Sequence, residues 1–130
     1  FIKKAGFVKN KTYFKEMYIH QITEKWGVDL SAISNQGKME KRFDFVVETK
    51  DKTYLLEVNF YSGGGSKLNE VARSYSDIAP KINSVPGFEF VWITDGIGWK
   101  SAKNKLQEAY NIIPSIYNLT DIKDFINGIR

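Results

Sequence analysis

The chain has 130 residues with 42% hydrophobic content, which suits one domain over residues 1–130 with a core of its own. It has no cysteine, which excludes disulfides and thiolate metal sites, and no apolar run is long enough to cross a membrane. The formal net charge of +4 permits a nucleic-acid partner without requiring one. We expect a protein of the reducing cytoplasm and, because the sequence begins at Phe1 instead of methionine, the C-terminal part of a longer protein.

The N-terminal quarter predicts little regular structure. Residues 1–11 are typical of the last turn of a helix, closed by a glycine and followed by a basic stretch. Residues 12–17 have no clear strand alternation, whereas apolar residues on one helical face predict a short helix over Ile19–Trp26 that ends at the next glycine. Residues 28–34 alternate apolar and polar side chains, and this pattern predicts the first strand.

Two further strands, over residues 42–47 and 54–61, are joined by a short polar turn at residues 50–52 and predict a hairpin. In the first strand, alternation predicts one face with Phe43, Phe45 and Val47 and another with Asp44 and Val46. In the second strand, it predicts one face with Leu56, Val58 and Phe60 and another with Leu55, Glu57 and Asn59.

Asp44 and Glu57 interrupt strands that are otherwise apolar and aromatic, and a hairpin can place them side by side. Two close carboxylates in half-buried strands lose solvation and repel each other unless a cation or a proton joins them. Mg²⁺ suits such a site because it needs few protein carboxylates and accepts a substrate phosphate. The alternative is a solvated sheet face, and the hairpin alone does not decide between the two. His20 is the single histidine, so a histidine-based metal cluster is excluded.

The C-terminal half alternates helices and strands. Glycines at 63–65 precede a helix over residues 67–79, which Pro80 is expected to end or kink. A doubly buried strand over 88–94, a helix over 100–112, a short strand over 116–119 and a last helix capped by Thr120 follow. Antiparallel strands that lead into a βαβ crossover predict an α/β fold, with a mixed sheet flanked by helices on both sides.

Two groups of residues could contact phosphate. Backbone N–H groups at Gly64, Gly65 and Ser66 precede a helix and could bind a phosphate oxygen, although a flexible connector has the same composition. Arg73 lies on or beside the polar face of that helix. Basic side chains before the hairpin either contact phosphates or are simply solvated: Lys38, Lys41 and Arg42.

A strand with Asp, a strand with Glu-x-Lys, a helix and a strand form the PD-(D/E)xK nuclease core, which this order resembles. Longer segments are more specific: VDLSAI, KRFDFVV, YLLEVNFYSGGGSKLNEVARSY, FVWITDGIGW and IYNLTDI. They resemble the DpnII-type, MboI-like family of type II restriction endonucleases, which cut DNA at GATC. The resemblance covers most of residues 28–122.

The resemblance implies a restriction-endonuclease-like fold, Mg²⁺-dependent hydrolysis of double-stranded DNA within a restriction-modification system, and a homodimer for a palindromic site. Asp44 and Glu57 would hold the metal. The chain departs from the general pattern at Asn59, where a lysine is usual, because a neutral amide supplies no cation. Either a metal-bound hydroxide suffices, or Lys67 replaces the lysine. A DNA-binding module that has lost catalysis and a repair or junction nuclease are the alternatives.

Overall fold

The computed structural model describes residues 12–30, 33, 41–60, 66–95, 103–118 and 121–129. The strands are β1 (Tyr13–Tyr18), β2 (Arg42–Glu48), β3 (Thr53–Phe60), β4 (Phe88–Asp95) and β5 (Ile116–Tyr117). The helices are α1 (Ile19–Trp26), α2 (Ser66–Asn83), α3 (Lys103–Ile112) and α4 (Ile122–Gly128). Across these ranges, no helix is long and apolar enough to cross a membrane.

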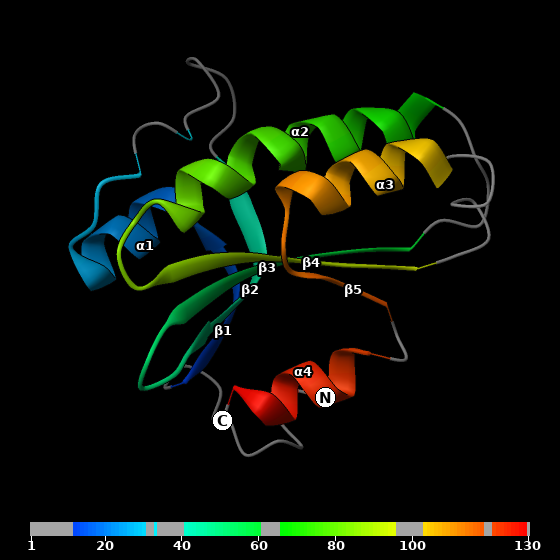
Figure 1. The fold of residues 1–130 in the computed structure, drawn as a ribbon. Helices are drawn as coiled ribbons and strands as arrows, with labels where there is room; N and C mark the ends of the chain where they lie inside the picture. The colour runs from blue at the N-terminus through cyan, green and yellow to red at the C-terminus, as the bar shows by residue number, and fades with distance from the viewer. Residues whose placement is uncertain are drawn as a thin grey trace.

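The five strands form one sheet in the order β1-β2-β3-β4-β5 (Figure 1). β1, β2 and β3 are antiparallel neighbours, whereas β4 is parallel to both β3 and β5. The parallel pairs are connected through α2 and α3, as crossovers require. The mixed sheet and the hairpin turn between β2 and β3 were both predicted, and both are confirmed.

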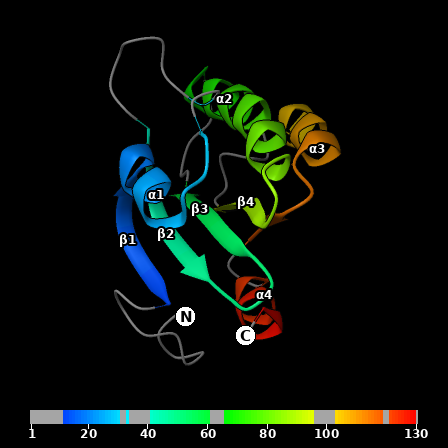
Figure 2. The same cartoon turned by 90° about the vertical axis from the view of Figure 1, so that its left-hand side faces the viewer.

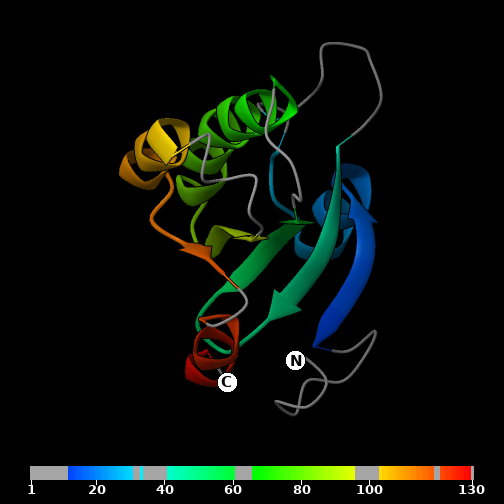
Figure 3. The same ribbon diagram turned by 90° about the vertical axis from the view of Figure 1, so that its right-hand side faces the viewer.

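Helices cover both faces of the sheet, as predicted. One core cluster joins α1, α2 and α3 to the sheet through buried residues of each helix: Ile22, Ala72, Tyr75, Ile78, Ala79, Ile82 and Ala109. The second cluster joins α4 to the opposite face through Ile122 and Ile126. The two turned views place α2 and α3 together on one side and α4 on the other (Figures 2 and 3). The face under α2 holds the larger core and the candidate site.

The predicted alternation of β2 is wrong at its start. Phe43 packs in the α2-side cluster together with Val46, whereas Phe45 and Val47 pack on the α4 side. The neighbouring strand changes faces at the same level, where Glu16 has a φ of 53°. Lys15 pairs with Phe45, and Met17 pairs with Phe43. Glu16 therefore lies opposite Asp44, but these two residues do not form a β-bridge pair. A left-handed residue turns the strand at that point, so a strict period of two fails there.

The first strand also lies elsewhere than predicted. Residues 12–17 form most of β1, although they lack clear alternation, because the face change at Glu16 obscures the pattern. Residues 28–30 are not in a strand; Leu30 is buried, and its carbonyl accepts a hydrogen bond from the Ile33 N–H at 3.0 Å. Leu30 and Ile33 are both buried in the α2-side cluster, so these two residues reach the core without strand pairing. The remainder of the predicted strand, and the predicted helix end within residues 1–11, lie outside the described residues.

The helices agree better with the sequence. α1 has the predicted bounds, and Gly27 ends it with a φ of 64° and an N–H that donates to the Thr23 carbonyl. α2 was predicted to end or kink at Pro80, yet it continues to Asn83, so the predicted end is wrong. The next turn buries Ile82 completely, and this burial offsets the hydrogen bond that proline cannot donate.

Candidate active site

Glu57 is the most deeply buried carboxylate that the structure describes. It lies on β3 and is 4% exposed, on the face that α2 covers. The Tyr75 hydroxyl, from α2, donates a hydrogen bond to Glu57 Oε2 at 2.9 Å. The Tyr75 ring is fixed in turn by edge contacts with Phe90 and Trp92. Helix packing therefore holds one carboxylate oxygen in place.

The other oxygen of Glu57 faces a lysine. The Nζ atom of Lys41 lies 2.8 Å from Glu57 Oε1, which is ion-pair range. The angles are not those of a hydrogen bond, however, and within the described part of the chain Oε1 is a buried acceptor without a hydrogen-bond partner. An acceptor left in this way is costly unless another group uses it. Oε1 thus meets the Lys41 ammonium, which a bound metal cation would have to displace.

The surroundings of Glu57 shift the pKa of its carboxyl upward. Burial raises the pKa of its carboxyl above the ordinary value; the nearby Lys41 ammonium opposes this change, and the negative charge of Asp44 adds to it. The Tyr75 hydrogen bond also opposes the rise in pKa. Asp44 thus lies within electrostatic range of Glu57, and the prediction that the two carboxylates share one cation stays a prediction. A buried carboxylate with a raised pKa beside a second acid is typical of functional sites.

Asp44 is held by the backbone of the next strand. Its Oδ2 atom accepts a hydrogen bond from the Val58 N–H at 2.8 Å. The β2–β3 ladder extends only as far as Phe45, which pairs with Leu56. The Asp44 side chain therefore accepts the hydrogen bond of β3 that follows the last backbone pair between the two strands. This bond holds the Asp44 carboxylate next to β3, the strand that carries Glu57.

Asn59 shares the face of Glu57, as alternation predicted. Its Oδ1 atom accepts a hydrogen bond from Trp92 Nε1 at 2.9 Å. Trp92 is completely buried in the α2-side cluster, as expected of a core tryptophan. The oxygen of Asn59 is therefore turned towards the core, and the residue supplies no positive charge to the site.

The remaining predicted residues are only partly placed. Ser66 and Lys67 begin α2, but their side chains lie outside the described part of the structure, as do Gly64 and Gly65 entirely. Arg73 is exposed on α2. A role of Lys67 at Glu57, and phosphate contacts by the other four, stay predictions.

Two residues at Glu57 were not predicted as site residues. Lys41 was treated as one member of a basic cluster, although it stands three residues before Asp44. Tyr75 lies within the predicted helix over residues 67–79, where an apolar stripe faces the core, and its ring packs in the α2-side cluster. The available signal was the hydroxyl, because a tyrosine buried in a helix stripe needs a polar partner.

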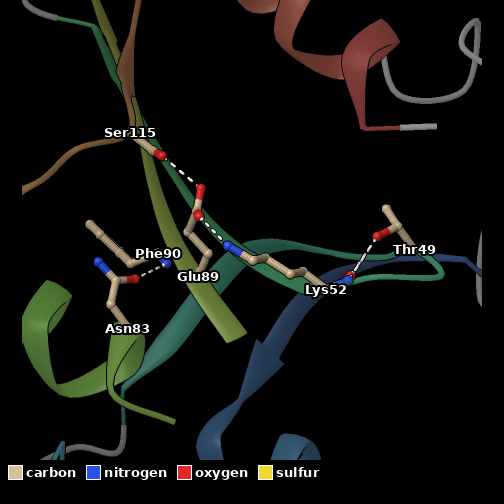
Figure 4. A network of polar contacts seen from close by, with 6 residues as sticks. All are labelled: Thr49, Lys52, Asn83, Glu89, Phe90 and Ser115. Carbon is tan, nitrogen blue, oxygen red and sulfur yellow. Dashed lines mark hydrogen bonds and ion pairs between the residues drawn. The ribbon is translucent and has the colours of Figure 1, made fainter. Parts of the chain in front are cut away.

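Another polar network lies near the beginnings of β3 and β4 (Figure 4). Lys52 Nζ lies 3.1 Å from Glu89 Oε1, and the Ser115 hydroxyl donates to Glu89 Oε2 at 2.7 Å. Asn83 Oδ1 accepts from the Phe90 N–H. The side chains of Lys52 and Glu89 are 47% and 21% exposed, so this carboxylate–lysine pair is more solvated than the pair at Glu57. The Lys52–Glu89 pair is therefore a suitable control for the buried Lys41–Glu57 pair.

The residues at Asp44 and Glu57 fit a hard divalent cation. Both supply carboxylate oxygens, and Glu57 Oε1 is buried without a hydrogen-bond donor. In the described ranges, no group of three or more His, Cys, Asp or Glu side chains could hold a metal. Mg²⁺ needs only one or two protein carboxylates when waters and a substrate phosphate complete its shell, so this small donor set suits it.

Comparison with known proteins points to one family. A profile described as DpnII restriction endonuclease matches residues 1–128. The chain is 50% identical over 123 residues to the type II restriction enzyme DpnII of Streptococcus pneumoniae, covering 95% of this chain and 43% of that protein. It is 64% identical over 98 residues to the type II restriction enzyme MboI of Moraxella bovis, covering 75% of this chain and 35% of that protein.

A third relative is archaeal. The type II restriction enzyme MjaIII of Methanocaldococcus jannaschii is 43% identical over 119 residues, covering 89% of this chain and 40% of that protein. The chain thus spans less than half the length of these relatives. No solved structure matches it.

Proposed function

The chain belongs to the DpnII restriction endonuclease family, and from that premise we propose that it holds the catalytic carboxylates of a type II restriction endonuclease. The proposed reaction is hydrolysis of DNA phosphodiester bonds at GATC sites, with Mg²⁺, within a restriction-modification system. The observation that supports it best is Glu57, a buried carboxylate that meets the Lys41 ammonium and has Asp44 nearby on the adjoining strand.

Asp44 and Glu57 are the residues that would hold the cation. When bound, Mg²⁺ supplies neutralisation of developing charge on the phosphate and a more acidic water. The chain itself supplies orientation: Tyr75 fixes one oxygen of Glu57, and the Val58 N–H fixes Asp44. The aromatic packing of Tyr75 against Phe90 and Trp92 limits rotation of the hydroxyl that performs this task. Rigid carboxylates keep the geometry needed for an in-line attack on phosphorus.

Double-stranded DNA is the proposed partner, with backbone contacts from the start of α2 and from Arg73. Because GATC is a palindrome, a two-fold dimer of the complete protein is the simplest arrangement that cuts both strands. Sedimentation of the complete protein on a short GATC duplex tests the dimer, and a single protein copy per duplex would refute it. A cytoplasmic location stays a prediction.

Cleavage assays on the complete protein test the activity directly. We expect unmethylated plasmid to be cut at GATC in Mg²⁺ and to stay intact in EDTA. Asp44→Asn and Glu57→Gln should abolish cutting while DNA binding persists. Asp77→Asn is the matched control, because this carboxylate is 69% exposed and pairs with Lys81 along α2. Cutting by the Glu57→Gln variant at the unmodified rate would refute the assignment of the site.

The same assay addresses the alternatives. A binding module that has lost catalysis would bind GATC duplexes in Ca²⁺ and leave them intact in Mg²⁺ or Mn²⁺. A repair or junction nuclease would cut branched DNA in preference to a linear GATC duplex. The neutral Asn59, with its oxygen bonded to Trp92, is the observation that keeps the inactive module in consideration.

A further inference from the structure

We propose that Lys41 is the catalytic lysine of this site: its ammonium pairs with Glu57 before metal binds and contacts the scissile phosphate afterwards. The inference rests on the proposed nuclease function and deepens it. It assigns the positive charge to a residue that precedes Asp44, in place of the position two residues after Glu57 where this chain has Asn59.

The position of Lys41 is unlike that of a solvated surface lysine. Its side chain is 17% exposed, and its Nζ atom lies 2.8 Å from Glu57 Oε1. The same atom lies 5.3 Å from the ring centroids of both Phe43 and Tyr75. Aromatic faces stabilise an ammonium without neutralising it. The site therefore keeps a desolvated positive charge directly beside the candidate metal ligand.

The backbone of Lys41 is fixed on its C-terminal side. Its carbonyl accepts a hydrogen bond from the N–H of Ile19, the first residue of α1, at 3.1 Å. The next residue, Arg42, begins β2 and pairs with Tyr18. The flexible four-carbon stem of the lysine lets its ammonium change position from this anchored backbone.

Ion pairing alone is a poor reason to keep Lys41 buried. The desolvation of a buried lysine–carboxylate pair often costs as much as the attraction returns, and here the contact lacks hydrogen-bond geometry. The ammonium is repelled from Oε1 once a divalent cation is bound there. A DNA phosphate beside that cation is a further anionic group in the proposed complex. Lys41 can reach it by a side-chain rotation and stabilise the extra charge of the transition state.

Charge removal in the complete protein is the first test. We expect Lys41→Met to lower the cleavage rate at saturating DNA and Mg²⁺ by about 100-fold or more. Ca²⁺ affinity without DNA, measured by calorimetry at pH 8.5, should stay the same or tighten because a competing cation is gone. Lys52→Met is the matched control, since it breaks the solvated pair with Glu89 and should leave both quantities unchanged. Lys41→Met cleavage close to the unmodified rate, or parallel loss of cleavage and metal affinity, would overturn the proposal.

A measurement on the unmodified protein covers the case in which Lys41→Met does not fold. Acylation of lysine amines, followed by peptide mass spectrometry, reports the accessibility of each Nζ. We expect Lys41 to react slowly without metal, several-fold faster with Ca²⁺, and slowly again with Ca²⁺ and a GATC duplex. Lys52 is the internal standard and should keep a constant rate. A Lys41 rate that ignores both Ca²⁺ and DNA would overturn the proposal.

The outcomes separate this inference from the proposed function. If Glu57→Gln is inactive while Lys41→Met cuts normally, the nuclease assignment stands and the role of Lys41 is wrong. If the unmodified protein does not cut DNA in any divalent metal, the nuclease function is wrong, and the inference about Lys41 falls with it.

Discussion

Removal of the Tyr75 hydroxyl tests whether Glu57 is held as an ionised ligand. In Tyr75→Phe the ring contacts with Phe90 and Trp92 remain, but Glu57 Oε2 loses its donor at 2.9 Å. A hydrogen bond to a charged group is worth about 1.5–3 kcal/mol, and one between neutral groups about 1 kcal/mol. We therefore expect the variant to lose about 2 kcal/mol of unfolding free energy where Glu57 is ionised and about 1 kcal/mol where it is protonated.

Urea denaturation of the complete protein in divalent-free buffer, at pH 5 and at pH 8.5, measures these losses. Tyr54→Phe is the control. Tyr54 is a buried tyrosine like Tyr75, but it lies on β3 and packs in the α4-side cluster, on the face opposite Glu57. Its loss should not depend on pH. Equal losses for Tyr75→Phe at the two pH values would refute the reasoning, since they would mean that the hydroxyl does not distinguish the two states of Glu57.

Three further predictions concern stability. The pKa of Glu57 is raised above its ordinary 4.5, so the folded state binds a proton more tightly than the unfolded state does. The unfolding free energy should therefore fall as pH rises from 4.5 through the folded-state pKa of Glu57. In titrations without divalent metal, Glu57→Gln should abolish this fall. Glu16→Gly should leave urea stability within about 1 kcal/mol, whereas Glu16→Val should cost about 2 kcal/mol, because a β-branched residue resists a φ of 53°. Pro80→Ala should raise stability by about 1–3 kcal/mol, because it restores an N–H donor inside α2; no gain in melts would contradict this.

The sequence predicts correctly which side chains of β3 point to each face of the sheet, because that strand alternates regularly. Leu55 packs on the α2 side, and Leu56 and Val58 pack on the α4 side. Glu57 and Asn59 follow the same alternation, and both bond to residues of the α2-side core. Local pattern suffices here because β3 pairs with β4 without interruption along its whole length.

The wrong alternation of β2 and the two unpredicted site residues have a common cause: both depend on contacts between residues far apart in the sequence. The face change at Glu16 depends on its position opposite Asp44, 28 residues later, which no local period encodes. Lys41 and Tyr75 approach Glu57 from 16 residues before it and 18 residues after it. Their residue types alone indicate a surface lysine and a core tyrosine. Only the packing of α2 on the sheet gives them a shared partner.

The location of the candidate site follows from the topology of the sheet. β3 pairs with β4 along its whole length, up to Phe60 opposite Asp95, but its ladder with β2 stops at Leu56. Beyond that point β3 needs a new acceptor for the Val58 N–H, and Asp44 provides it with a carboxylate. The same separation of strands leaves space for the Lys41 side chain to reach Glu57. The acidic pair thus lies at the place where an antiparallel hairpin diverges from a parallel sheet, and the divergence itself brings the second carboxylate to β3.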